Sequence, residues 1–523
     1  MAEASGTPGS TLATTVVRAA ALVAAVTVVA RLVGFARTAV LGRVLGATFL
    51  GDTYTATNAL PNVVYEIVAG GALASLVIPV LAGVDPDTAR RTAGALLSWT
   101  VLLLTPLSVL GVVFRRQLAE LLLNGSPQAA AQVDVGARLL AVFAPQVVLY
   151  GIGIVCTGML QANRRFFAAA LAPLVSSVVV IAAYLTFASS ESGREITTIT
   201  RQGELILSVG TTLGVVALTT TVALPVLARR SGWLPVLSLR FPPGVARRVR
   251  RLALAGVVAV AAQQVSVAVA LRLAAGERGA VVVFTLGTAV FLLPWAVLAV
   301  PIATSAFPEM STRASAGDDD GYAATARGGL RLVLLCGFAG AAALIAVADP
   351  LARLLLAAAP GAGVEELRRA IVAFAPGLPG YAVLAFASRA LYARNRSRAA
   401  ALATSSGWLL VVVTDVVLVL AAPRGWTGAA LGAGNAIGMT VAGVGLLAAL
   451  RRVAGPASVT GLGRTVAVGL LAAAVGSALG TVGGQLLQRE VPALLLAAVG
   501  AGLGVVVVLG ALERDDLRRL VRR

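Results

Sequence analysis

Charged side chains lie inside or beside the first two long apolar stretches of the sequence, between residues 30 and 82. Arg31 and Arg37 lie in the first stretch, Asp52 follows it, and Glu66 lies within the second. A charge at the centre of a bilayer costs on the order of 3 kcal/mol even on lenient insertion scales. We therefore expect these side chains to face a water-filled cavity or one another.

Arg31 and Arg37 are candidates for binding a diphosphate. A guanidinium stays charged and donates two parallel hydrogen bonds to a phosphate. On a regular helix these two residues point about 120° apart, and Gly34 between them predicts a bend that aims both at one cavity. Snorkelling of the long side chains to the membrane surface is the alternative.

Two carboxylates near these arginines are candidates for tuning their charge. Asp52 is expected either to pair with one of the arginines or to cap the helix that follows it. Glu66 comes one turn after the expected helix break at Pro61 and Asn62. Because desolvation opposes a lone charge, Glu66 is expected to be neutral or paired with arginine. A proton-coupling role is the alternative for Glu66.

Asp415 lies in the middle of another apolar run, WLLVVVTDVVLVLAA. A bare carboxylate is costly there, so we expect a bound cation, a proton or a polar neighbour such as Asn435. The sequence contains no histidine, which excludes histidine metal sites and proton relays, and it predicts no metal site. No phosphate-binding loop or dinucleotide fingerprint is convincing. We expect no enzymatic activity and no cofactor, with coupling to sodium, protons or the membrane potential as the open possibilities.

Composition identifies the class of protein that must hold these residues. The chain has 523 residues, of which 58% are hydrophobic and only 12% charged, whereas soluble domains carry about 25% charged residues. Its net charge of +19 comes from arginine alone, since the sequence has no lysine. The arginines lie between apolar runs, so orientation in the membrane and anionic lipid account for them better than nucleic acid does.

Apolar runs of about 20 residues recur nearly to the C-terminus and predict an all-α polytopic membrane protein. We expect about 14 transmembrane helices, forming two pseudo-symmetric six-helix lobes and two C-terminal helices. The predicted spans lie near residues 16–45 (broken), 57–82, 94–114, 137–160, 168–188, 205–228, 251–274, 280–306, 329–348, 369–392, 400–422, 427–450, 464–485 and 491–512.

The distribution of arginine predicts the orientation. One alternate set of loops carries about twice as many arginines as the other, and the richer set is expected to be cytoplasmic. With an even number of spans, both termini lie inside. The expected layout is a disordered cytoplasmic tail (1–15), an N-lobe (16–230), a basic cytoplasmic connector (231–250), a C-lobe (251–452), a C-terminal helix pair (463–512) and a basic tail (513–523).

An internal repeat supports the division into lobes. The matched positions are Arg138, Phe143-Ala144-Pro145 and Tyr150 in the first copy, and Arg369, Phe374-Ala375-Pro376 and Tyr381 in the second. Each pair is displaced by 369 − 138 = 231 residues. Because six spans separate the copies, both halves are expected to have the same topology about an axis along the membrane normal.

Four stretches resemble the MurJ/MviN lipid II flippases of the multidrug/oligosaccharidyl-lipid/polysaccharide (MOP) exporter superfamily. They are Arg31-Leu-Val-Gly-Phe-Ala-Arg37 with the following Gly46-Ala47 and Asp52, Leu60-Pro61-Asn62 to Ile78-Pro79, Gly158 to Phe166 running on to Pro173, and Leu224 to Gly232. Together with the spans, the resemblance covers nearly the whole chain. The first stretch is the most specific of the four.

The resemblance implies export of the undecaprenyl-diphosphate-linked peptidoglycan precursor across the bacterial cytoplasmic membrane. Transport would proceed without ATP, by alternating access between two lobes that enclose a cationic cavity. By position, Arg31, Arg37 and Asp52 match residues of that cavity, and helices 13 and 14 would hold the lipid tail in a groove. Expected partners are this lipid-linked saccharide, membrane lipids, and proteins of cell-wall synthesis and division.

Departures from the family pattern keep alternatives open. Tyr65 and Glu66 stand near a usual cavity arginine, Ala69-Gly70-Gly71 replaces a usual Ala-Glu-Gly, and Ala289 stands near another usual arginine. Each lost charge-assisted hydrogen bond is worth about 1.5–3 kcal/mol. The chain could therefore export another lipid-linked oligosaccharide, and a non-transporting cell-wall scaffold is the alternative from a different class.

Overall fold

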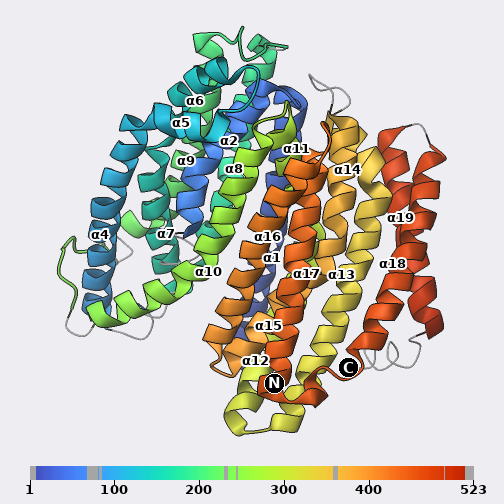
Figure 1. Ribbon diagram of the computed structural model, residues 1–523. Coiled ribbons are helices and arrows are strands. Elements are labelled where there is room, and N and C mark those ends of the chain that lie inside the picture. Colours follow the sequence, from blue (N-terminus) through green and yellow to red (C-terminus); the bar gives the residue numbers. More distant parts are fainter. Residues whose placement is uncertain are drawn as a thin grey trace, which may run out of the picture. The chain divides into compact units, whose positions relative to one another are not determined.

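Every secondary-structure element of the described residues is helical in the computed structural model (Figure 1). It describes residues 8–67, 81, 85–191, 193–228, 234–242, 245–356, 363–487 and 489–512. The helices are α1 (Pro8–Leu45), α2 (Phe49–Glu66), α4 (Pro86–Val113), α5 (Arg115–Leu123), α6 (Ala129–Phe143), α7 (Gln146–Ala162), α8 (Phe166–Glu191), α9 (Arg201–Leu227), α10 (Val245–Ala274), α11 (Ala280–Pro294), η3 (Trp295–Ala299), α12 (Val300–Ala316), α13 (Asp319–Leu356), α14 (Val364–Phe374), η4 (Ala375–Gly377), α15 (Leu378–Ala393), α16 (Ser397–Ala421), α17 (Thr427–Ala454), η5 (Pro456–Ser458), α18 (Leu462–Gln485) and α19 (Glu490–Leu512).

Twelve helical segments of the described residues are long and apolar enough to cross a bilayer. This finding establishes a multi-pass membrane protein. The expected number of 14 membrane-spanning helices is not established. Much of the expected span at 57–82 lies outside the described residues. The span expected at 251–274 falls within α10, whose segment Val260–Ala274 is a shorter apolar helix.

The N-terminal helix differs from its prediction. α1 is one continuous helix from Pro8, so the expected tail at 1–15 is helical from that residue onward, and residues 1–7 lie outside the described part. Proline is favoured in the first turn of a helix. The expected break near Gly34 is also absent. A Cβ at Gly34 would meet nothing within 4 Å among the described residues, so no close packing requires a glycine there.

Two compact units divide the chain near residue 257. The first comprises residues 1–44, 57–119 and 133–257, and the second comprises 45–56, 120–132 and 258–523. Two short segments from the N-terminal half therefore belong to the second unit, which the sequence did not predict. The expected connector at 231–250 is shortened by α10, which already begins at Val245. The basic tail at 513–523 lies outside the described residues.

The first unit is a helical bundle in which α7 packs on α4, α8 and α9. Its buried core includes Val155, Leu160, Val222 and Val226. The extended chain at 234–242 runs along α4 rather than away from it. Its backbone is held by the side chain of Arg90, which donates to Leu234 O at 3.1 Å, and by the Trp99 indole, which donates to Leu239 O at 3.0 Å.

The second unit is built around α13, which packs against α14, α15, α18 and α19. α18 and α19 lie side by side at one edge (Figure 1). Small residues bring these two helices together, as is common in membranes. A Cβ added at Gly476 would lie 2.9 Å from Ala501 O, and one at Gly480 would lie 2.5 Å from Ala497 O.

Local structure at the repeated motif is the same in both copies. α6 ends at Phe143 and α14 at Phe374, and in each case Ala-Pro interrupts the span before the next helix begins. The two non-glycine residues with positive φ in the described chain are Arg164, at 58°, and Asn395, at 57°. They are 395 − 164 = 231 positions apart, which is the displacement of the sequence repeat. The structure thus supports a duplication.

Candidate functional site

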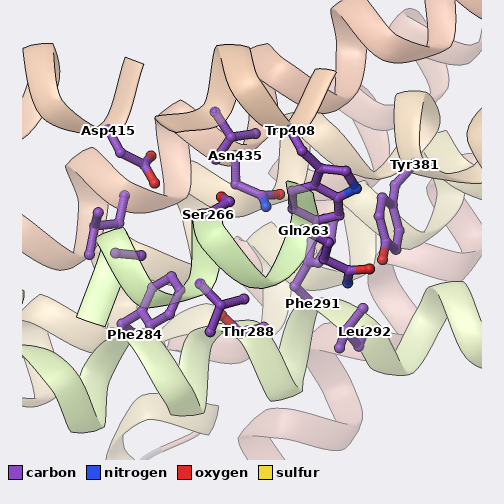
Figure 2. Close-up of a pocket in the computed structure, with 14 residues that line it drawn as sticks. Gln263, Ser266, Phe284, Thr288, Phe291, Leu292, Tyr381, Trp408, Asp415 and Asn435 are labelled. Atoms are coloured by element: carbon purple, nitrogen blue, oxygen red, sulfur yellow. The ribbon is translucent and has the colours of Figure 1, made fainter. Parts of the chain in front are cut away.

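A cavity of about 70 Å³ lies inside the second unit. Five helices line it, namely α10, α11, α15, α16 and α17 (Figure 2). The lining residues are Gln263, Ser266, Val267, Ala270, Phe284, Thr288, Phe291, Leu292, Tyr381, Trp408, Val411, Asp415, Leu431 and Asn435.

Helical spacing explains why these residues share one space. On α16, Trp408, Val411 and Asp415 are separated by three and four residues, which places them on one face. The α10 residues follow the same rule from Gln263 to Ala270, and so do the α11 residues from Phe284 to Leu292. Each helix therefore contributes one stripe to the cavity.

Three buried oxygens of this cavity have no hydrogen-bond partner among the described residues: Asp415 Oδ1, Asn435 Oδ1 and Thr288 Oγ1. They come from three different helices. Asp415 is only 1% exposed. Buried polar groups are nearly always satisfied in native proteins, so three such atoms in one cavity need an explanation. A ligand that interacts with oxygen would provide it.

Gly434 on α17 allows the Asp415 carboxylate to occupy its position. A Cβ at Gly434 would overlap Asp415 Oδ1. The neighbouring Thr414 hydroxyl donates to the Gly434 carbonyl at 3.2 Å, which holds α16 and α17 together at this level. Small residues thus bring the two helices close where the carboxylate lies.

Aromatic rings form another side of the cavity (Figure 2). The Tyr381 ring lies 5.6 Å from Phe291, 5.0 Å from Trp295 and 6.3 Å from Trp408, measured between centroids. Aromatic pairs at such distances attract one another and resist displacement. The polar oxygens therefore lie beside a closely packed wall, a setting that limits their contact with bulk water.

The donor set suits a hard monovalent cation, or a proton on Asp415. Carboxylate, amide and hydroxyl oxygens are the groups that hard cations prefer. The cavity lining contains a single carboxylate, and in the described residues there is no group of three or more His, Cys, Asp or Glu that could hold a metal ion. A single negative charge matches a single positive charge. Asp415, Asn435 and Thr288 would hold the ion.

Asp52 has a different role from either expected one. Its Oδ2 accepts a 2.6 Å hydrogen bond from Gly279 N–H and its Oδ1 a 3.1 Å bond from Val282 N–H, so it caps α11 within the second unit. Thr48, not Asp52, caps α2, because its Oγ1 accepts from Gly51 N–H. Both local expectations for Asp52 were wrong because its partner lies 227 residues away in the sequence.

Arg31 and Arg37 are not brought onto one face of α1. Arg31 is exposed and Arg37 half-buried, and the helix between them is continuous. Six residues of α-helix separate them by about 9 Å along the axis and turn them about 120° apart. The continuous helix gives no support for the expected convergence, and the diphosphate role of both residues stays a prediction.

Glu66 ends α2 and is exposed, without an ion pair among the described residues. The expected helix break at Pro61 and Asn62 is not present, because α2 continues through both to Glu66. Asn62 Nδ2 donates to Asn58 O at 2.9 Å, which adds a hydrogen bond in the turn that proline weakens. Tyr150, a repeat residue, donates to Asn62 Oδ1 at 2.9 Å.

Sequence reasoning identified Asp415 and Asn435 but missed most of the cavity around them. Gln263 and Ser266 are polar residues inside an apolar run, a signal that could have identified α10 as a wall. Thr288 had no such signal, because threonine is common in membrane helices, where its hydroxyl bonds to backbone carbonyls. The aromatic residues are indistinguishable from ordinary core by sequence alone.

Comparison of folds defines the class of protein. A solved structure described as lipid II flippase MurJ in an inward closed conformation aligns over 95% of this chain and 99% of its own, with a TM-score of 0.78 and 15% identity. An inward-facing multidrug resistance MATE family transporter of the MOP superfamily aligns over 80% of this chain and 94% of its own, with a TM-score of 0.66 and 16% identity. The fold is thus that of MOP-type membrane transporters.

Sequence comparison identifies the family. The family described as lipid II flippase MurJ matches residues 41–496. A probable lipid II flippase MurJ of Rhizobium tropici is 26% identical over 70% of this chain and 69% of its own length. The lipid II flippase MurJ of Burkholderia cenocepacia is 25% identical over 72% of this chain and 73% of its own. The chain belongs to the MurJ family of lipid II flippases.

Proposed function

We propose that this protein translocates lipid II, the undecaprenyl-diphosphate-linked peptidoglycan precursor, across the cytoplasmic membrane. The observation that carries the proposal is the family match over residues 41–496. The all-helical fold with two units and a MOP-type relative supports it. Transport proceeds by alternating access and needs no nucleotide hydrolysis, so the protein is a transporter rather than an enzyme.

The proposed orientation has both termini in the cytoplasm. Its support is the arginine excess at one alternate set of span ends and loops, including Arg90 and Arg91 near the start of α4 and Arg451 and Arg452 at the end of α17. In this orientation the C-terminal ends of α4 and α13 lie on the extracytoplasmic side. The N-terminal ends of α8 and α16 lie in the cytoplasm.

The cavity around Asp415 is the proposed coupling site. Binding of sodium or a proton there supplies a positive charge that neutralises the carboxylate and bridges α16 to α17 and α11. Because Asp415, Asn435 and Thr288 come from different helices, occupancy changes the relative stability of alternative helix arrangements. A ligand shifts such an equilibrium only through differential affinity for the two states.

Arg31 and Arg37 are the proposed contacts of the diphosphate. Both lie on α1, in the segment Leu22–Leu45, of which little is buried against the rest of the described chain. Since they point in directions about 120° apart, they engage the anionic group from different positions rather than as one clamp. Asp52 contributes indirectly, by holding the N-terminus of α11.

Translocation in vesicles tests the proposal. Purified protein is reconstituted with fluorescent lipid II, and the fraction that becomes accessible to a membrane-impermeant quencher is followed with time in the absence of ATP. We expect protein-dependent exchange of lipid II that is faster than exchange of undecaprenyl diphosphate linked to an unrelated saccharide. Equal rates for both would favour export of another lipid-linked oligosaccharide, and no exchange of either would favour the scaffold.

A further inference from the structure

A second cavity, of about 350 Å³, lies within the first unit and is almost entirely apolar. Eleven residues line it, from α2, α4, α5, α6, α7 and the turns that join them. Among them are Leu110, Phe114, Leu118 and Ala144. Leu110 and Phe114 are 50% and 47% exposed, so the cavity is open at the surface of the unit.

Three prolines and a glycine lie in or next to the elements that line this space. Pro61 lines the cavity from α2, Pro106 lies one turn before Leu110 in α4, and Pro145 separates α6 from α7. Proline removes a backbone hydrogen bond and bends the helix that contains it. Gly111 adds room, since a Cβ there would lie 3.0 Å from the Ala144 methyl group.

Two arginines follow directly after Phe114, one of the lining residues. α5 begins directly after Phe114, and its first residues are Arg115 and Arg116, both exposed. Arg115 donates to Val112 O at 3.1 Å, which keeps its guanidinium next to the end of α4. Arg116 is paired with Asp134 at 3.0 Å. Leu118, three residues after Arg115 on the same helix face, lines the cavity itself.

We propose that this cavity binds one acyl chain of an anionic phospholipid whose phosphate contacts Arg115. The lining is hydrocarbon, as an acyl chain requires, and the guanidinium of Arg115, the residue directly after the exposed lining residue Phe114, favours a phosphate. Arg116 is neutralised by Asp134, which makes Arg115 the cation that selects the head group. In the proposed orientation the lipid belongs to the outer leaflet.

This site shares no residue with the proposed coupling site or the proposed diphosphate contacts, and it does not depend on them. All eleven lining residues belong to the first unit, whereas the cavity around Asp415 belongs to the second. A lipid held among these helices stabilises the unit that contains them, because ligands that bind only the folded state stabilise it. In this proposal the lipid is a structural ligand rather than a transported one.

Native mass spectrometry of the full-length protein tests the proposal. The protein is exchanged into detergent that contains equal amounts of phosphatidylglycerol and phosphatidylcholine of the same chain length, and retained lipid is counted. We expect phosphatidylglycerol adducts to exceed phosphatidylcholine adducts at least threefold. Arg115→Gln should make the two equal, whereas Arg489→Gln, at another exposed arginine, should leave the preference unchanged.

A matched pair of variants tests the acyl chain. Leu110→Trp fills the cavity, and Val109→Trp changes a neighbour of similar exposure, 53%, that does not line it. We expect Leu110→Trp to lose the retained lipid and Val109→Trp to keep it. Equal retention of the two lipids by the unmodified protein, or equal effects of the two tryptophans, would overturn the proposal. The lipid comparison needs no variant, so misfolding of one variant leaves the test intact.

Discussion

The position of one carboxylate, that of Asp415, depends on the absence of a side chain at Gly434. The two residues belong to different helices, and any Cβ at Gly434 would overlap Asp415 Oδ1. A substitution at Gly434 therefore tests the proposed coupling site at a position that carries no charge and no hydrogen-bonding side chain. The result shows whether transport needs the Asp415 carboxylate in one defined position or only a polar residue in the cavity.

Gly434→Ala should impair transport as severely as Asp415→Asn, by tenfold or more, because it displaces the carboxylate without removing it. Gly445→Ala on the same helix is the control, since a Cβ there would lie 3.7 Å from the nearest group, the Ala403 methyl. Lipid II exchange in vesicles is measured together with its dependence on sodium and pH. Normal exchange by Gly434→Ala would contradict the coupling site.

A second prediction about single residues concerns Arg31 and Arg37. Lysine keeps the charge but loses the planar fork that binds a phosphate through two hydrogen bonds. Arg31→Lys and Arg37→Lys should each weaken binding of undecaprenyl diphosphate by about 1.5–3 kcal/mol. Arg424→Lys, at an exposed loop arginine, should have no effect. Unchanged affinity in both variants would remove these residues from the site.

Among the elements, α11 has an N-terminus that is capped by a residue distant in sequence. Asp52 is completely buried and accepts two backbone hydrogen bonds from the first turn of α11. The N-terminal N–H groups of a helix need such partners. Because α11 also contributes Thr288 to the cavity, the cap helps to position a proposed ligand.

Asp52→Ala should lower the free energy of unfolding by about 1–3 kcal/mol, because it leaves buried N–H groups without partners. Thermal unfolding in detergent measures this effect. Asp85→Ala removes an exposed cap of α4, whose carboxylate accepts from Thr88 N–H at 2.9 Å, and should have a smaller effect. Equal losses of stability in the two variants would contradict the expectation that a buried cap contributes more than an exposed one.

Helices α18 and α19 provide an independent prediction about packing. Gly480→Val should destabilise the pair by about 1–3 kcal/mol, because a side chain there meets the α19 backbone. Gly502→Val on α19 is the control, since a Cβ there would meet nothing within 4 Å. Thermal unfolding should separate the two variants. If it does not, close contact between these helices is not what holds them together.

For the molecule as a whole, sequence predicts best what depends on composition and periodicity. Apolar runs identified the membrane helices, the repeat identified two similar halves, and a lone carboxylate identified one wall of the cavity. Contacts between distant segments were not predictable in this way. Asp52 looked like a local cap, Gly34 looked like a bend, and nothing in the sequence showed that residues 45–56 belong to the second unit.

The most direct measurement of the central claim is the exposure of lipid II on the outer surface of cells in which this protein is the sole flippase. After depletion, lipid II should accumulate inside and become inaccessible to an impermeant probe. Re-expression of the unmodified chain should restore exposure, and Asp415→Asn should not. Normal exposure after depletion, in cells that lack every other flippase, would contradict the account.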